Sequence, residues 1–220
     1  MKAAKMLEML DAGKIEELKT ELRHEVYQEF LKNRPDEKKR YGAMKKYFGY
    51  VNSSRKALQK PYLVNYEGIS YTSFCNSYSL VLTTELPGAI ELFDSVHDGN
   101  YPDVTRLINC SEDKDEIDIS KVLAEAKSKG YKLKKSEVTS NHYLMHYDGA
   151  YFRMGLIDIS YSIINDGKAV TVYHKKGSGN SPMTIVNDLG YMLVMPVRIE
   201  ELDEDWIVVE ADAREKHTTL

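Results

Sequence analysis

The stretch SPMTIVNDLGYMLVMPVRI, residues 181–199, decides how this chain folds. Residues 182–187 and again 191–199 are rich in apolar and β-branched side chains, which is typical of β-strands. Between them, Asn187-Asp188-Leu189-Gly190 has the composition of a tight turn. The stretch therefore predicts an antiparallel strand pair near the end of the chain.

Outward from this pair, the chain predicts a unit of one helix followed by antiparallel strands, used three times from about residues 43, 117 and 157. The expected fold class is α+β, with helices packed on antiparallel sheets. Helices are expected at 3–12, 14–33, 43–58, 118–130 and 157–165, with a charged linker at 35–40 and a short helical piece at 89–96. Strands are expected at 62–66, 69–74, 78–84, 131–138, 142–147, 150–155, 168–175, 182–187 and 191–199, and Trp206–Val209 is a candidate edge strand or packing anchor.

The composition is that of a soluble globular protein. Of its 220 residues, 42% are hydrophobic and 29% charged, which suffices for one or two domains with a core. No apolar run approaches the roughly 18 residues that a membrane-spanning helix needs, and the N-terminus lacks a secretory pattern. Two cysteines, Cys75 and Cys110, are too few for a disulfide framework or a zinc site. We therefore expect a cytoplasmic protein.

The formal net charge of −4 argues against a uniformly basic surface, but the charges are segregated along the chain. Residues 41–70 carry five basic side chains against one acidic, and residues 121–135 carry six lysines against one acidic. Acidic residues concentrate at 112–118 and 200–215. A charge run by itself usually marks a solvated face, but two basic helices in an acidic chain indicate a local surface for an anionic partner.

The residues give no support to catalysis or to a cofactor. The Gly-containing stretch 175–182 lies between two expected strands, without the helix that a phosphate-binding loop requires. The six histidines have no metal-ligand spacing on a helix, and Cys75 is expected to be a packed thiol. The acidic cluster 112–118 lacks the spacing of a calcium loop and is expected to cap the following helix. We expect no catalytic residue, no metal and no cofactor.

Three separated segments resemble the bacterial DNA sliding clamp family, the DNA polymerase III beta subunit. Residues 61–82 contain EGISYTSF followed by CNSYSL, which is similar to the strand, turn and Thr-Asp-Gly-His-Arg-Leu element of the family. Residues 101–108, YPDVTRLI, resemble the aromatic-Pro-Asp-Tyr-Arg-Arg-Val element that joins the middle and last clamp domains. The strand pair 181–186 and 191–199 resembles the closing pair that ends in Met-Pro-Met-Arg-Leu. Together the segments span about 43–199.

The resemblance implies a DNA-clamp-like fold of about one and a half domains. Its expected divisions are a charged helical extension at 1–40, a half clamp-like domain at 41–100, a complete one at 101–199 and an acidic tail at 200–220. Only residues 83–100 separate the first two segments, where a full clamp has another half-domain. Closure of a ring needs matching edges at both ends of a subunit, so ring formation and a homo-oligomer stay open. Truncation of this kind favours a phage or another mobile element as the source.

The resemblance also implies two binding sites. In the family, a hydrophobic groove captures peptide motifs of polymerases and clamp loaders, and helices face duplex DNA. The groove candidates, matched position by position, are Cys75, Ser77, Tyr78, Ser79, Leu80, Pro102, Leu107, Val194, Met195, Pro196, Val197 and Arg198. The family's Gly-His-Arg is replaced by Ser77-Tyr78-Ser79, so the peptide specificity need not be retained. The DNA candidates are Lys45, Lys46, Arg55, Lys56, Lys121, Lys127 and Lys129, which would contact phosphates weakly and with steep salt dependence.

Three functions follow for testing. The leading hypothesis is a sliding-clamp-like replication accessory protein, or processivity factor, that is not an enzyme and binds partner peptides and the DNA backbone. The second is a clamp-derived adaptor or decoy that keeps the groove, lacks the ring and docks a partner through its N-terminal helices. The third is a DNA- or nucleotide-processing enzyme with an unusual site, which the residue types support least. A further hypothesis places Trp206 of the tail near the groove.

Overall fold

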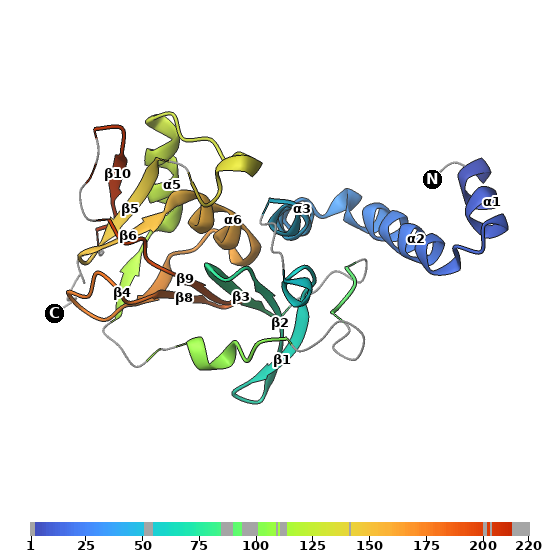
Figure 1. Ribbon diagram of the computed structural model, residues 1–220, viewed down its shortest axis with the longest axis horizontal. Coiled ribbons are helices and arrows are strands. Elements are labelled where there is room, and N and C mark those ends of the chain that lie inside the picture. The colour runs from blue at the N-terminus through green and yellow to red at the C-terminus, as the bar shows by residue number, and fades with distance from the viewer. Residues whose placement is uncertain are drawn as a thin grey trace.

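The structure of the protein is a computed structural model (Figure 1). It describes residues 3–50, 55–84, 90–93, 101–108, 110, 114–140, 142–199, 202 and 204–212. Of the short helical piece expected at 89–96, the structure describes residues 90–93, which form no helix, so this part of the prediction was wrong. The helix expected at 43–58 is helical to Tyr50 and residues 56–58 form a separate short 3₁₀ turn, whereas residues 51–54 lie outside the described residues. Within the described residues, no helix combines the length and the apolar character needed to cross a membrane.

A seven-stranded antiparallel sheet forms the centre of the molecule. Its order is β1-β2-β3-β9-β8-β7-β4, so the closing pair at 183–194 lies between the first three strands and the two strands at the far edge. The predicted strand pair is therefore confirmed and links both halves of the sheet. The bounds are β1 Tyr62–Tyr66, β2 Ile69–Cys75, β3 Ser79–Thr83, β9 Gly190–Val194, β8 Met183–Asn187, β7 Val170–Tyr173 and β4 Lys114–Ile117.

A second, three-stranded sheet contains β5 (Tyr143–Tyr147), β6 (Ala150–Arg153) and β10 (Ile207–Glu210). Strand β10 runs parallel to β5, so the predicted edge strand after Trp206 is confirmed. Trp206 itself packs against the ring of His142 and beneath the guanidinium of Arg153, 4.7 Å from the ring centre. The tail is thereby fixed on the smaller sheet.

The helices are α1 Ala3–Asp11, α2 Ile15–Phe30, α3 Pro35–Tyr50, α5 Ile119–Ser128 and α6 Met154–Ile164, with short 3₁₀ turns at 31–33, 56–58, 105–107 and 135–137. Helix α6 lies between the two sheets and contacts strands of both, together with α3 and α5 (Figure 1). All its residues except Ser162 are buried. Helix α6 is thus the centre of the main core.

The expected order of helix and strands is confirmed three times, as α3 with β1–β3, α5 with β5–β6 and α6 with β7–β9. Helices α1 and α2 form an arm that projects from this body (Figure 1). The fold class is α+β, as predicted.

Several expected boundaries were wrong. Residues 35–40 are the first turns of α3 and no linker, because proline is well tolerated at the first position of a helix. Residues 131–138 form no strand; Tyr131 and Val138 are buried anchors of an irregular segment that follows Gly130. Helix α6 begins at Met154, whereas 150–155 was expected to be strand, because short apolar runs fit a buried strand and a buried helix equally well.

The acidic stretch before α5 was only partly understood from the sequence. Asp118 is the N-cap of α5 and accepts a hydrogen bond from the Lys121 backbone N–H at 3.0 Å, so the capping prediction is confirmed. The residues before it form β4, an edge strand in which Ile117 pairs with Val170. Ile117 therefore ends a strand and lies before the helix.

Strand β9 ends at Val194, five residues before the expected end at Ile199. Pro196 has no backbone N–H to continue a ladder. The chain then crosses between the sheets: Met195 N–H donates to the Tyr78 carbonyl at 2.9 Å, and Val197 N–H donates to the Tyr151 carbonyl of β6 at 2.7 Å. The closing segment thus connects the large sheet with the small one.

Candidate functional site

The three segments singled out in the sequence come together on one face of the large sheet. Strands β3 and β9 pair directly, with Ser79 opposite Val194 and Thr83 opposite Gly190. The segment 101–108 crosses the sheet face turned away from α6, as the short helix at 105–107 indicates (Figure 1). One apolar cluster joins all three segments: Leu58, Tyr71, Cys75, Leu80, Leu82, Val104, Ile108 and Leu193.

The segment 101–108 is anchored by Tyr101. Its ring stacks on that of Tyr62 with centres 4.8 Å apart, and its hydroxyl lies 3.1 Å from the Ser73 hydroxyl. Burial raises the pKa of the Tyr101 hydroxyl strongly, so this group stays protonated and able to donate. The anchor fixes how the following Val104 and Ile108 enter the apolar cluster.

Asn76 holds the turn between β2 and β3, a role that the sequence analysis missed. Its side-chain oxygen accepts from the backbone N–H of Tyr78 at 2.9 Å and of Ser79 at 2.7 Å, and its amide donates to the Ser79 hydroxyl at 2.9 Å. The backbone φ angle of Ser77 is 76°, a value that residues other than Gly, Asn and Asp rarely adopt. The signal in the sequence is the Asn itself, because an Asn side chain commonly accepts a hydrogen bond from the backbone N–H two residues further on and thereby predicts a turn.

The predicted groove residues fall into three groups by exposure. Cys75, Ser79, Leu80 and Val194 are buried and support the surface from below. Pro102, Pro196 and Val197 are half-buried. The remaining five are exposed: Ser77, Tyr78, Leu107, Met195 and Arg198. We call Ser77, Tyr78 and Met195, which meet at one end of the β3–β9 ladder, the turn surface.

Two members of the turn surface are direct neighbours. The backbone bond from Met195 to Tyr78 places these two residues side by side at the end of the β3–β9 ladder. Tyr78 is 55% exposed and Met195 38%, so two large apolar side chains meet the solvent side by side. Burial raises the pKa of the Cys75 thiol, so it is a packed thiol, as predicted, and a poor nucleophile.

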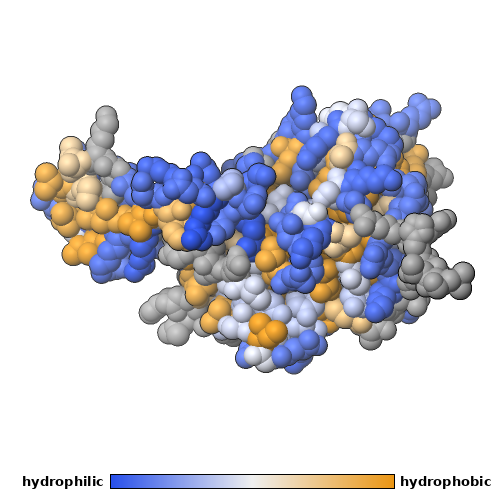
Figure 2. Space-filling view, turned by 180° about the vertical axis from the view of Figure 1, so that it is seen from behind, coloured by the Kyte–Doolittle hydropathy of each residue, from blue (hydrophilic) through white to orange (hydrophobic). Residues whose placement is uncertain are grey.

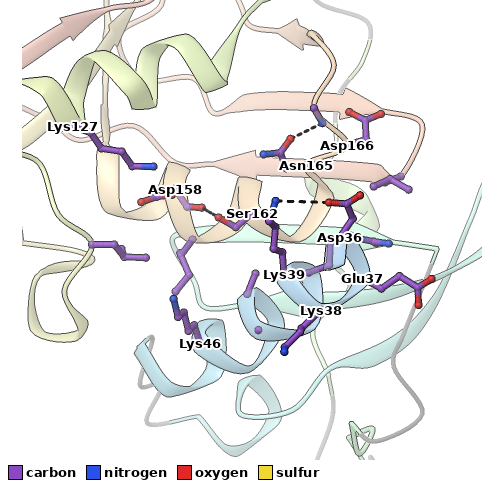
Figure 3. Close-up of a pocket in the computed structure, with 17 residues that line it drawn as sticks. Asp36, Glu37, Lys38, Lys39, Lys46, Lys127, Asp158, Ser162, Asn165 and Asp166 are labelled. Atoms are coloured by element: carbon purple, nitrogen blue, oxygen red, sulfur yellow. Dashed lines mark hydrogen bonds and ion pairs between the residues drawn. The ribbon is translucent and has the colours of Figure 1, made fainter. Parts of the chain in front are cut away.

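The predicted DNA-contacting side chains are all exposed, but they do not share one face. Lys46 of α3 and Lys127 of α5 line a common cavity of about 930 Å³ over α6, which we call the helix cavity (Figure 3). Lys45 lines a different cavity with His24 and Lys60, because successive helix residues point about 100° apart. Arg55 and Lys56 lie at the 3₁₀ turn beside Leu58 and the apolar cluster.

The two remaining lysines lie on or just after α5. Lys121 is exposed in the first turn of this helix. Lys129 forms an ion pair with Glu125 at 2.9 Å and donates to the Val208 carbonyl at 3.2 Å, so part of its charge is engaged within the protein.

The helix cavity contains further charges that the sequence analysis did not place there. Lys38, Lys39 and Arg40 line it because residues 35–40 are helical. Arg40 also anchors α3: its Nε donates to the Ile163 carbonyl at 2.9 Å, and its terminal nitrogen donates to the Thr83 hydroxyl at 3.0 Å.

Carboxylates offset these positive charges. Asp158 of α6 lies in the cavity between Lys46 and Lys127, with Asp36, Glu37 and Asp166 farther along the lining (Figure 3). Burial raises the pKa of Asp158, although the two lysines act in the opposite direction. Five basic groups therefore face four carboxyl groups in the lining, which leaves the helix cavity only weakly positive.

No protein-family model and no curated protein matches this sequence. Solved structures do match. The chain is similar to the polymerase III beta of Caulobacter crescentus, with 13% identity and a TM-score of 0.46, over 74% of this chain and 64% of that chain. It is similar to the DNA polymerase III beta sliding clamp of Bartonella birtlesii bound to griselimycin, with 12% identity and a TM-score of 0.45, over 70% and 63%.

A third match is a putative DNA polymerase III beta subunit of Eubacterium rectale, with 14% identity and a TM-score of 0.34, over 60% and 43%. The chain spans less than two thirds of the length of each of these structures. The resemblance to sliding clamps predicted from the sequence is thus confirmed, as a distant and partial one. At this identity the likeness concerns the fold and assigns no role to any residue.

Proposed function

We propose that this chain is a sliding-clamp-like replication accessory protein that binds short peptide motifs, of polymerase or clamp-loader type, on the turn surface. The observation that carries the proposal is the convergence of residues 61–82, 101–108 and 181–199 around one apolar cluster. In this proposal, residues 41–100 are a half clamp-like domain and 101–199 a complete one, joined by the β3–β9 ladder. The role is one of binding, without catalysis.

The chemistry of the turn surface suits peptide capture. Tyr78 and Met195 offer large exposed apolar area on a rigid backbone, so little conformational entropy is lost on binding. Methionine adapts its shape to different apolar anchors. Exposed Arg198 supplies a cation close to the same segment, which favours peptides with an acidic residue beside their apolar anchors.

A fluorescent clamp-binding peptide tests this proposal directly. We expect Tyr78→Ala and Met195→Ala each to weaken its binding by about fivefold to tenfold, the loss typical of a contact worth about 1 kcal/mol. Val26→Ala removes an exposed apolar side chain from the arm and serves as the matched control. Unchanged affinity in both turn-surface variants would remove the assignment.

We further propose that the helix cavity contacts the backbone of duplex DNA through Lys46 and Lys127. Contacts with phosphates alone are independent of sequence and weaken as salt rises. Lys127→Glu is expected to weaken binding to a long duplex and to flatten its salt dependence. Lys176→Glu changes the charge equally on an exposed loop elsewhere and is expected to have a smaller effect.

A second candidate function is an adaptor or decoy that binds peptides but neither DNA nor other subunits in a ring. It is favoured by the carboxyl groups among the lysines of the helix cavity, which repel phosphates. The decisive measurement is DNA binding at low salt. No binding there, together with intact peptide binding, favours the adaptor over the clamp-like role.

A further inference from the structure

The arm formed by α1 and α2 carries much of the exposed apolar surface. Of the twelve large apolar side chains exposed in the described part of the chain, five belong to these two helices: Leu7, Leu10, Ile15, Val26 and Phe30. Figure 2 shows hydrophobic surface, in orange, along the arm. A hollow of about 560 Å³ runs along α2 beside Leu22, Val26 and Phe30. A concentration of this kind marks an interaction surface.

Four apolar side chains of α2 form a stripe on the side turned away from the body, whereas Leu18, beside this stripe, is buried. At about 100° per residue, Ile15, Leu22, Val26 and Phe30 fall within a sector of about 80°. The opposite side of α2 faces the body, where the Thr20 hydroxyl donates to Glu91 at 2.6 Å and His24 bonds Tyr41. Val26, in the middle of the stripe, is 71% exposed.

The charges beside the stripe are opposite on its two edges. By the same helical geometry, Arg23 lies at one edge, and Glu25 and Glu29 follow the other. Lys19 falls within the stripe and pairs with Glu16 of its own helix at 2.6 Å, and Glu29 pairs with Lys32. Two copies of this helix related by a twofold axis parallel to it place the basic edge of each against the acidic edge of the other. An antiparallel pair would instead place basic against basic and acidic against acidic.

We propose that the arm is a self-association surface, on which a second copy of this chain docks with its α2 parallel to the first. In that arrangement, Arg23 of each copy lies about 3 Å along the axis from Glu25 of its partner, given a rise of about 1.5 Å per residue. The stripe meets its own counterpart, so Val26 packs against Val26. This interface is independent of the proposed function, since it uses neither the turn surface nor the helix cavity.

Sedimentation equilibrium of the full chain, from about 1 to about 300 µM, is the first test, because small interfaces associate in this range. We expect a monomer–dimer equilibrium that Val26→Glu weakens at least tenfold. Leu63→Glu, on an exposed residue of β1, is the matched control and is expected to leave the equilibrium unchanged. A monomer at every concentration, or a dimer indifferent to Val26→Glu, overturns the proposal.

Charge reversal and cross-linking test the orientation. Arg23→Glu is expected to weaken the dimer, and Arg23→Glu with Glu25→Arg is expected to restore it; a stronger dimer from Arg23→Glu alone would show antiparallel pairing. With Cys110→Ser as background, Ile15→Cys is expected to cross-link to itself. Cross-linking only between Ile15→Cys and Phe30→Cys chains, which lie at opposite ends of the stripe, would also overturn the parallel arrangement.

Discussion

The turn surface and the helix cavity are built in different ways, although both lie on the same body. The turn surface stands on backbone hydrogen bonds: the β3–β9 ladder, the bond from Met195 to Tyr78 and the turn pinned by Asn76. The helix cavity is assembled from side chains of α3, α5 and α6, and its charges partly cancel. The first surface is therefore fixed by the fold, whereas the second is tuned by single side chains.

The largest expected effect comes from Gly190, at the start of β9. Its φ is 146°, and a Cβ there would lie 1.9 Å from the Leu82 carbonyl oxygen across the ladder. Gly190→Ala is therefore expected to lower the free energy of unfolding by about 3–5 kcal/mol and to abolish peptide binding. Urea unfolding measures the loss.

Gly42→Ala is the control for this substitution. A Cβ at Gly42 meets nothing within 4 Å, and the residue lies inside α3, where alanine is the better helix former. It is expected to be neutral or slightly stabilising. A stable Gly190→Ala variant would show that the β3–β9 ladder can shift, and that the strand pairing does not fix the position of the turn surface.

Asn76→Ala is expected to have the next largest effect. It removes the three hydrogen bonds that shape the turn and leaves buried donors without partners, at a cost of about 2–3 kcal/mol. The affinity for a clamp-binding peptide is expected to fall with the stability, because Tyr78 loses its fixed position. DNA binding should stay unchanged, and a parallel loss of DNA binding would contradict the independence of the two surfaces.

Substitutions of Arg40 test the helix cavity through their separate effects on stability, DNA binding and peptide binding. Arg40→Ala removes the bonds to Ile163 and Thr83 and is expected to cost about 1–2 kcal/mol, while it weakens DNA binding more than peptide binding. Arg40→Lys keeps the charge but not the two-nitrogen geometry. It is expected to lose stability and to retain the salt dependence of DNA binding, which separates anchoring from charge.

The smallest effect is expected from Asp158→Asn. Because burial raises the folded-state pKa of this carboxyl, the folded state binds the proton more tightly than the unfolded state does. The stability that this group contributes is therefore fully present below the pKa of the unfolded state, which is about 4 for aspartate. This contribution is lost as the pH rises through the higher pKa of the folded state. The variant should be more stable than the natural protein at neutral pH, by less than about 1 kcal/mol.

Thermal unfolding between pH 4 and pH 8 measures this difference, which should shrink toward the acid end. Asp36→Asn removes a similar charge from a mostly exposed position and is expected to show no such pH dependence. A less stable Asp158→Asn variant at neutral pH would mean that the carboxylate is needed for the packing of α3, α5 and α6. The variant should also bind DNA more tightly, because one negative charge leaves the cavity.

Much of the fold followed from local patterns. The closing strand pair, the turn before Gly190 and the repeated order of helix and strands were predicted because each depends on residues close in sequence. The predictions failed where local patterns are ambiguous. Residues 131–138 resemble a strand in their alternation, and 154–156 have the apolar run of either a strand or a helix.

The candidate sites were only partly predictable. The resemblance offered Tyr78, Met195 and Lys127 as candidates, and their binding roles stay predictions. It did not separate the exposed Tyr78 from the buried Leu80, nor reveal that Lys46 and Lys127 share a cavity while Lys45 does not. Asp158 was missed because a single carboxyl inside an apolar helix has no pattern of its own.

The sequence alone determined the α+β class, the three cycles of helix and strands and the resemblance to sliding clamps, since all of these depend on short-range periodicity or on motifs. Only the tertiary structure decided that β9 pairs with β3, that the closing segment bridges both sheets and that the arm's apolar stripe faces away from the body. The physical reason is that pairing, burial and the balance of charge in a cavity depend on residues far apart in the chain.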